Sequence, residues 1–242
     1  LLLPIEVCIQ CDTREHINVD ARAAFDGGAA RIELCSEMQY DGLTPDVILI
    51  REARKIFKKN GLMVMIRPRQ GHFIYSREEV QLMIQQIHCA ATAGADGVVI
   101  GALRANDNRL DCRTLGKLVE ISKTYGLGVT LHRAFDATPD PFEALEQLIA
   151  LNVDRVLTSG TAWSTGQGAL AGVERLCQLI KLAAARIEVV IGGGISADNV
   201  AAILAGIPAC DSKRSLHAYS GVHDKGRVQI NQVKALVEAT TI

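Results

Sequence analysis

Strand-like and helix-like segments alternate along all 242 residues, and this alternation limits the possible folds more than any other feature. Short apolar segments predict strands at 5–10, 30–35, 62–67, 97–101, 127–132, 153–158, 187–192 and 214–218. Amphipathic segments predict helices at 14–26, 45–60, 76–93, 112–124, 139–150, 170–184, 196–204 and 229–239. Eight strand–helix units favour a closed parallel barrel.

We therefore predict an α/β fold, a single (β/α)8 TIM-type barrel over residues 1–242, irregular near the C-terminus where 214–218 is short and polar. A doubly wound sheet is the alternative, but the chain lacks an early glycine-rich dinucleotide fingerprint. The apolar fraction of 48% supports a sizeable core.

Charge and cysteine content limit the environment and the partners. The formal net charge of −1 predicts no strong attraction to nucleic acid or to an anionic membrane. The apolar start, 1–4, is too short to anchor the chain in a membrane. Seven cysteines, an odd number, do not suggest a disulfide framework, so we expect reduced thiols and a cytoplasmic location.

Four predicted strands each have one apolar face and one face with polar or sulfur groups, because alternate side chains of a strand point to opposite sides. The polar faces hold Glu6 and Cys8, Glu33 and Cys35, Met65 and Arg67, and Thr130 and His132. Charge in the dry layer against the helices would go unpaired. We therefore expect Glu6, Glu33, Arg67 and His132 to converge inside the barrel.

These four side chains are the candidate catalytic residues. We expect Arg67 to bridge both carboxylates in bidentate fashion, and His132 to act as acid or base. The competing interpretation is an ion-pair layer that only fills the barrel. Buried charge is a poor source of stability and often marks a site, so the functional interpretation is preferred.

Glycine-rich turns after two later strands are candidate ligand-binding segments. In 192–196, Gly193 and Gly194 offer backbone amides before a helix, a common phosphate seat in these barrels, although a tight turn explains the glycines equally well. Ser159 and Gly160 could expose amides to a ligand or simply turn the chain. The loop residues His72, Phe73 and Tyr75 could form a lid, and Trp163 could cover the barrel mouth or contact another subunit.

Six blocks follow one another along the chain: Ile5-Glu6-Val7-Cys8, Arg31-Ile32-Glu33-Leu34-Cys35-Ser36, Met65-Ile66-Arg67-Pro68-Arg69, His132-Arg133-Ala134-Phe135-Asp136, Leu157-Thr158-Ser159-Gly160 and Gly192-Gly193-Gly194-Ile195. Taken together and in this order, they resemble the CutC family. The resemblance implies a TIM-type barrel, a cytoplasmic homodimer or higher homo-oligomer, a role in copper homeostasis, and an enzyme-like pocket at the strand C-termini. The segment 206–228 matches the family pattern poorly, which leaves the eighth loop's contribution open.

Two chemistries follow for the site. Cys8 and Cys35 match the family cysteines proposed for copper, and two soft thiolates could hold Cu(I) nearly linearly; two small buried side chains are the competing interpretation. Alternatively, the chain is an enzyme for a small phosphorylated or carboxylated metabolite, in which His132 moves a proton, Glu6 or Glu33 is its partner and Arg67 holds the anion. In a third interpretation the pocket is vestigial and the barrel is an interaction scaffold.

Overall fold

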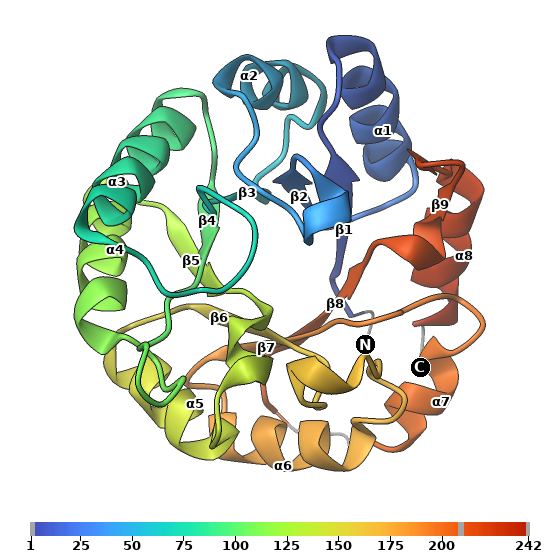
Figure 1. Cartoon of the computed structure of the whole chain (residues 1–242). Coiled ribbons are helices and arrows are strands. Elements are labelled where there is room, and N and C mark those ends of the chain that lie inside the picture. The colour runs from blue at the N-terminus through green and yellow to red at the C-terminus, as the bar shows by residue number, and fades with distance from the viewer. Residues whose placement is uncertain (1–2, 208–210, 241–242) are drawn as a thin grey trace.

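A computed structural model describes residues 3–207 and 211–240, and within these ranges eight parallel strands close into a barrel (Figure 1). The strands are β1 (Ile5–Gln10), β2 (Arg31–Cys35), β3 (Leu62–Met65), β4 (Gly97–Ile100), β5 (Gly128–Leu131), β6 (Arg155–Thr158), β7 (Glu188–Ile191) and β8 (Arg214–Ala218). Parallel pairing of β1 with both β2 and β8 completes the ring. The predicted TIM-type barrel is thus confirmed.

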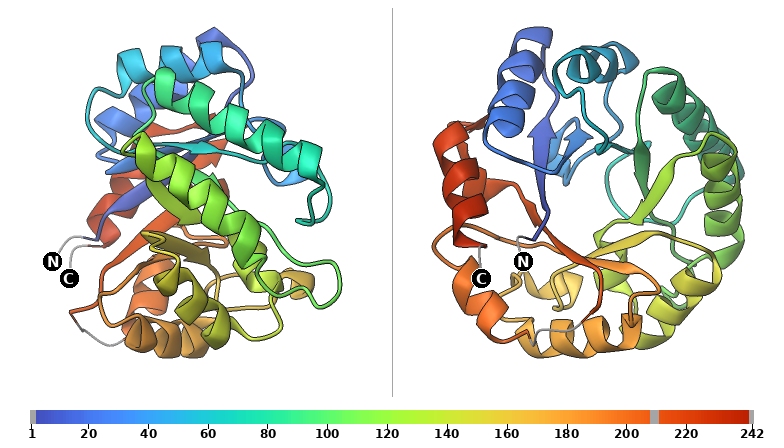
Figure 2. Two further views of the ribbon diagram at one scale, coloured as in Figure 1. Left: turned by 90° about the vertical axis from the view of Figure 1, so that its left-hand side faces the viewer. Right: turned by 180° about the vertical axis from the view of Figure 1, so that it is seen from behind.

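Helices follow the strands and surround them, as the side and rear views show (Figure 2). They are α1 (Arg14–Asp26), α2 (Val47–Ile56), α3 (Arg77–Thr92), α4 (Cys112–Thr124), α5 (Pro141–Ala150), α6 (Val173–Ala183), α7 (Val200–Ala205) and α8 (Ile230–Ala239). Local chemistry fixes several ends: the Ser76 hydroxyl accepts from the Glu79 amide, and the Glu79 carboxylate accepts from the Ser76 amide, which is a capping box for α3.

The expected irregularity near the C-terminus takes two forms. The helix α7 begins at Val200, later than predicted, because the Ser196 amide donates to Asn199 Oδ1 and holds that stretch in a turn. After β8, a short 3-10 turn and a hairpin of β9 (His223–Asp224) and β10 (Arg227–Val228) precede α8. Of the segment 206–228, residues 208–210 lie outside the described residues.

The alternation of side chains along the strands produces two separate cores. Val7, Ile32 and Val129 belong to the large apolar layer between strands and helices. A smaller core fills the barrel interior; it consists of Cys8, Cys35, Met63, Met65 and Val99, with Met38 and Tyr219 packed against it. The predicted inward and outward faces of β1, β2, β3 and β5 are confirmed.

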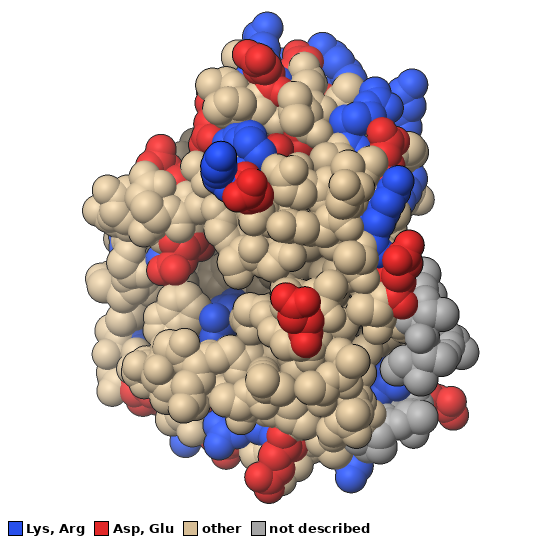
Figure 3. Space-filling view, turned by 90° about the vertical axis from the view of Figure 1, so that its right-hand side faces the viewer, with Lys and Arg blue, Asp and Glu red and all other residues tan. Residues whose placement is uncertain are grey.

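None of the helices described here is both long enough and apolar enough to cross a membrane. Lysine and arginine are mixed with acidic side chains among uncharged residues on the face drawn in Figure 3, without a continuous field of one sign. That distribution is consistent with the near-neutral net charge.

Candidate functional site

A cavity of about 150 Å³ opens at the C-terminal end of the barrel strands, where TIM barrels carry their active sites. Strands β1, β2, β3, β6 and β8 supply its inner part, and the loops after β2, β3, β5 and β6 supply its rim. Its walls are formed by Cys8, Glu33, Cys35, Met38, Asp41, Met65, Arg67, Phe73, His132, Arg133, Leu157, Trp163 and His217. Five of the six predicted catalytic and metal-binding residues therefore share one cavity, and only Glu6 does not line it.

The innermost polar group is an ion pair between Glu33 and His217. His217 Nε2 donates to Glu33 Oε2 at 2.7 Å, and 3% of the Glu33 side chain is exposed. Burial alone would raise the pKa of Glu33, but the His217 imidazolium outweighs burial and lowers it below its usual range. For the same reason Glu33 raises the pKa of His217 well above its usual value despite burial. The pair is therefore carboxylate and imidazolium at neutral pH.

His132 stands at the end of β5 in the opposite protonation state. Burial, followed by the nearby Arg67 cation, lowers the pKa of His132 to about 3, so its ring is neutral at neutral pH. Its Nδ1 accepts from the Ala134 amide at 3.0 Å, which assigns the proton to Nε2. Gly101 makes room for the ring, because a Cβ at that position would overlap the imidazole. His132 thus presents an Nε2–H group and is a donor.

Arg67 does not bridge the carboxylates as the sequence suggested. Its guanidinium donates to main-chain carbonyls, at 2.5 Å to Tyr40, 3.1 Å to Gly42 and 2.8 Å to Gly71. The reason is its position beyond the end of β3, level with the loops rather than with the strand interior. Arg67 is only 3% exposed, and no carboxylate in residues 3–207 or 211–240 forms an ion pair with it.

The bridging role belongs to Arg31, which sequence analysis did not single out. Its Nε donates to Glu6 at 2.9 Å and its Nη2 to Glu188 at 2.7 Å. Glu6 therefore lies one layer deeper than the cavity, although its carboxylate comes within 4.8 Å of the Glu33 and His217 ligand atoms. The alternation rule could have found Arg31, because it shares the inward face of β2 with Glu33 and Cys35.

Cys8 and Cys35 lie side by side on β1 and β2, with 3.8 Å between their Sγ atoms and the Cys8 thiol donating. Glu33 completes a group of three potential metal ligands whose atoms lie within 4.8 Å of one another. Both cysteines are buried. The hydrogen-bonded contact with the Cys8 sulfur, followed by burial, raises the pKa of Cys35 well above its usual value, so this thiol is protonated before any ion binds.

The four predicted ligand-binding residues lie outside the cavity lining. Ser159 is fully buried and hydrogen-bonded to Asp136, and Gly160 packs against the Gly172 carbonyl. Gly193 and Gly194 have φ of 99° and 77°, which favours glycine, and α7 has six residues and begins only at Val200. Their geometry agrees with the tight-turn interpretation.

One further group at the cavity was not predicted, and a second consists of loop residues that were expected to form a lid or to cover the barrel mouth. His217 shares the inward face of β8 with Ser215, so the alternation applied to β8 would have identified it. Phe73 and Trp163 come from two loops and meet over the cavity, with ring centroids 5.9 Å apart. The sequence placed both in loops but gave no signal that they would touch.

The geometry agrees with what comparisons with known proteins show. The CutC family model matches residues 3–215. A family protein CutC of Vibrio cholerae serotype O1 is 44% identical over 199 residues, which cover 82% of this chain and 74% of that protein. A family protein CutC from Pasteurella multocida is 43% identical over 204 residues, which cover 84% of this chain and 77% of that protein.

Solved structures support the same assignment. The structure of the copper homeostasis protein CutC from Streptococcus agalactiae superposes on this chain with a TM-score of 0.76 at 29% sequence identity. The superposition covers 89% of this chain and 98% of that one. Deoxyribose phosphate aldolase from Aeropyrum pernix shares the fold alone, with a TM-score of 0.64 at 15% identity. That superposition covers 97% of this chain and 88% of the aldolase chain. Family model, relatives and barrel agree, and this chain belongs to the CutC family.

Proposed function

We propose that the cavity binds a small anionic metabolite and transfers a proton on it, as an acid–base enzyme. The charge balance of the cavity supports an anion. Arg67 is a buried cation whose guanidinium donates to three main-chain carbonyls and forms no ion pair with a carboxylate in the described residues, and burying a charge without an opposite charge is costly. A carboxylate or phosphate in the cavity would compensate it.

The observation that carries this proposal is a set of three buried polar atoms around one cavity. Glu33 Oε1, Arg67 Nε and His132 Nε2 have no hydrogen-bond partner within the described part of the chain. Leaving a buried polar group unpaired costs about 1–3 kcal/mol, and such groups are normally paired in native proteins. A polar ligand would satisfy all three atoms: the acceptor on β2 and the two donors just beyond the ends of β3 and β5.

The protonation states suggest a role for each residue. The neutral imidazole of His132 would donate from Nε2–H, and the Arg67 cation would donate from Nε–H. Both would donate to an oxygen that gains negative charge, as donors in an oxyanion site do. The Glu33 carboxylate would take a proton, while the His217 imidazolium keeps it ionised. Proton abstraction next to a carbonyl group is the reaction class that this arrangement suits best.

Ligand-dependent stabilisation tests the proposal. Purified protein is screened by thermal unfolding against small carboxylates and phosphate esters. An anion bound in the cavity raises Tm, and His132→Phe, which keeps a ring but removes the donor, should weaken its binding roughly tenfold or more. The proposal fails if no anion in the panel raises the Tm of the wild-type protein. It also fails if each anion that stabilises the wild-type protein raises the Tm of His132→Phe by the same amount.

Direct Cu(I) binding by Cys8 and Cys35 is the second candidate function, and the 3.8 Å separation of their sulfurs favours it. Two thiols and the Glu33 carboxylate form a donor set that a soft ion accepts. Linear coordination is less well matched, because two metal–sulfur bonds of about 2.3 Å laid end to end span about 4.6 Å. The ion would be cargo in this role, and Cys35 would have to lose its proton to bind it.

Competition with a chromophoric Cu(I) chelator tests this second function. If the pair binds the ion, the wild-type protein takes up one Cu(I), and Cys8→Ser and Cys35→Ser each lose that stoichiometric binding because a hydroxyl is a poor soft ligand. The exposed Cys89 on α3 provides the control: Cys89→Ser should bind as the wild type does. Equal binding by all four proteins would place copper elsewhere.

A cytoplasmic location, a homo-oligomeric state and the absence of nucleic-acid and membrane partners stay predictions.

A further inference from the structure

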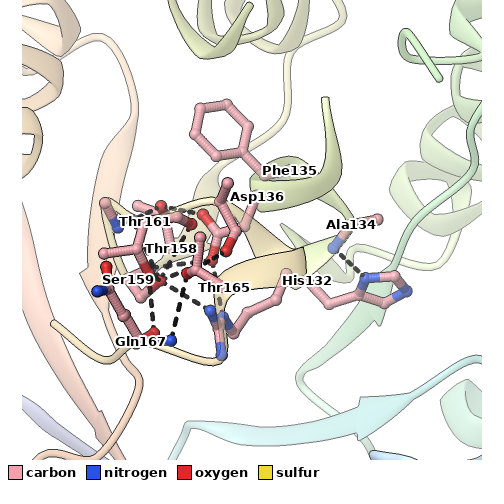
Figure 4. A network of polar contacts seen from close by, with 12 residues as sticks. His132, Ala134, Phe135, Asp136, Thr158, Ser159, Thr161, Thr165 and Gln167 are labelled. Carbon is pink, nitrogen blue, oxygen red and sulfur yellow. Dashed lines mark hydrogen bonds and ion pairs between the residues drawn. The ribbon is translucent and has the colours of Figure 1, made fainter. Parts of the chain in front are cut away.

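A single 3-10 turn, Arg133–Ala137, follows His132 and connects the cavity to the loop after β6. Figure 4 shows its Asp136 pointing away from His132, toward Thr158 and Ser159 at the end of β6. The Thr158 hydroxyl donates to Asp136 Oδ1, and the Ser159 amide and hydroxyl donate to Oδ2 at 3.1 Å each. Only 2% of the Asp136 side chain is exposed.

Asp136 also fixes Arg133, which lines the cavity. Arg133 Nε donates to Asp136 Oδ2 at 2.7 Å, and its Nη2 donates to Ser159 Oγ at 2.7 Å. A guanidinium held by two hydrogen bonds in its own plane has a fixed orientation as well as a fixed position. Two of the three guanidinium nitrogens of Arg133 are thus committed to groups behind the cavity wall.

The flat face of Arg133 supports the aromatic cover of the cavity. Its Cζ lies 5.0 Å from the ring centroid of Trp163, a cation–π contact. Trp163 meets Phe73 edge-on, and Phe73 in turn lies 4.9 Å from the His132 ring and 5.1 Å from Arg67 Cζ. The contacts therefore run without a gap from a buried carboxylate to the two donors of the proposed site.

We propose that Asp136 is a positioning residue that, through Arg133, holds Trp163 and Phe73 over the cavity. Without its charge, Arg133 loses the counter-ion that helps to set its plane, and Trp163 loses its support. The same turn supplies the Ala134 amide that fixes the tautomer of His132, so one short segment sets the donor and its cover. The inference deepens the proposed ligand site and rests on it for its purpose, but its geometry can be tested without any ligand.

Intrinsic fluorescence reports directly on the surroundings of Trp163, because it is the one tryptophan among the 242 residues. In Asp136→Asn the side chain keeps its shape but loses its charge, and one of its two acceptor oxygens becomes an NH2 group. We expect the acrylamide quenching constant of Trp163 to rise roughly twofold, as a half-buried indole becomes accessible, and its emission to shift to the red.

Asp20 provides a matched control, because it belongs to a separate polar network that does not include Asp136 or Arg133. It is a fully buried carboxylate of α1 that accepts from Arg227 and from the Val228 amide, each at 3.0 Å. Asp20→Asn should lower stability and leave the quenching of Trp163 as in the wild-type protein. Arg133→Lys, which keeps the charge but not the flat fork, should reproduce the quenching change of Asp136→Asn.

The outcomes separate this inference from the proposed function. Unchanged quenching in folded Asp136→Asn and Arg133→Lys, or an equal change in Asp20→Asn, would overturn the positioning role. A quenching change confined to the two cavity variants supports it, whether or not the screen of anions yields a ligand. If Asp136→Asn does not fold, Arg133→Lys carries the test alone.

Discussion

Glu33→Gln is expected to lower the free energy of unfolding at neutral pH by about 3 kcal/mol, because it removes one partner of a buried ion pair. His217 then either keeps an uncompensated charge or gives up its proton, and both cost energy. Glu33 also carries the unpaired Oε1 that faces the cavity, so any proton transfer by the site should fall about 10²–10⁴-fold. Urea unfolding and steady-state rates measure the two effects.

A double-mutant cycle separates the ion pair from the loss of packing. His217→Gln should be destabilising as well, but Glu33→Gln/His217→Gln should be less destabilised than the sum by about 1–3 kcal/mol, because two amides can still hydrogen-bond. The exposed pair of Glu146 and Arg186 is the control: Glu146→Gln makes the same chemical change and should have a small effect. Additive single effects at positions 33 and 217 would show that the pair is not coupled.

The coupling should depend on pH in a defined window. The raised pKa of His217 means that its contribution is complete below the unfolded value of 6.5 and is lost as pH rises through the folded pKa. The lowered pKa of Glu33 means that its contribution is present above the unfolded value of 4.5 and is lost as pH falls through the folded pKa. The coupling energy should therefore be largest between these two unfolded values.

His132→Gln is expected to remove much of the protein's sensitivity to acid. The folded-state pKa of about 3 lies below the unfolded value of 6.5, so the unfolded chain binds more protons between those values and stability falls as pH falls. From pH 7 to pH 4 this one imidazole should cost about 3 kcal/mol. Glutamine does not titrate and can still accept from Ala134 and donate into the cavity.

Unfolding free energies of the two proteins, measured at half-unit steps from pH 7 to pH 4, test this prediction. The wild-type curve should descend more steeply, and the difference should disappear above pH 7. His88→Gln, which removes an exposed imidazole on α3, is the matched control for the loss of a histidine elsewhere in the fold. Parallel curves for the wild-type protein and His132→Gln would contradict a buried neutral imidazole at this position.

The fold and the inward faces follow from local patterns in the sequence. Alternation along β1 and β2 is a property of each strand alone, so it was enough to place Glu6, Cys8, Glu33 and Cys35 inside a barrel. Eight strand–helix units were likewise enough to predict closure of the barrel. These features depend on residues a few positions apart.

The partners of those side chains depend on the tertiary structure, because strand parity fixes a face but not a height, a rotamer or a neighbour. Closure of the ring sets β8 beside β1 and brings His217 to Glu33, 184 positions away along the chain. The register of β1 against β2 places Arg31 beside Glu6, while Arg67 lies beyond the end of β3 and donates to loop carbonyls instead. The sequence by itself determined which side chains face inward; the closed barrel decided which charges meet, because ion pairing acts over a few ångströms.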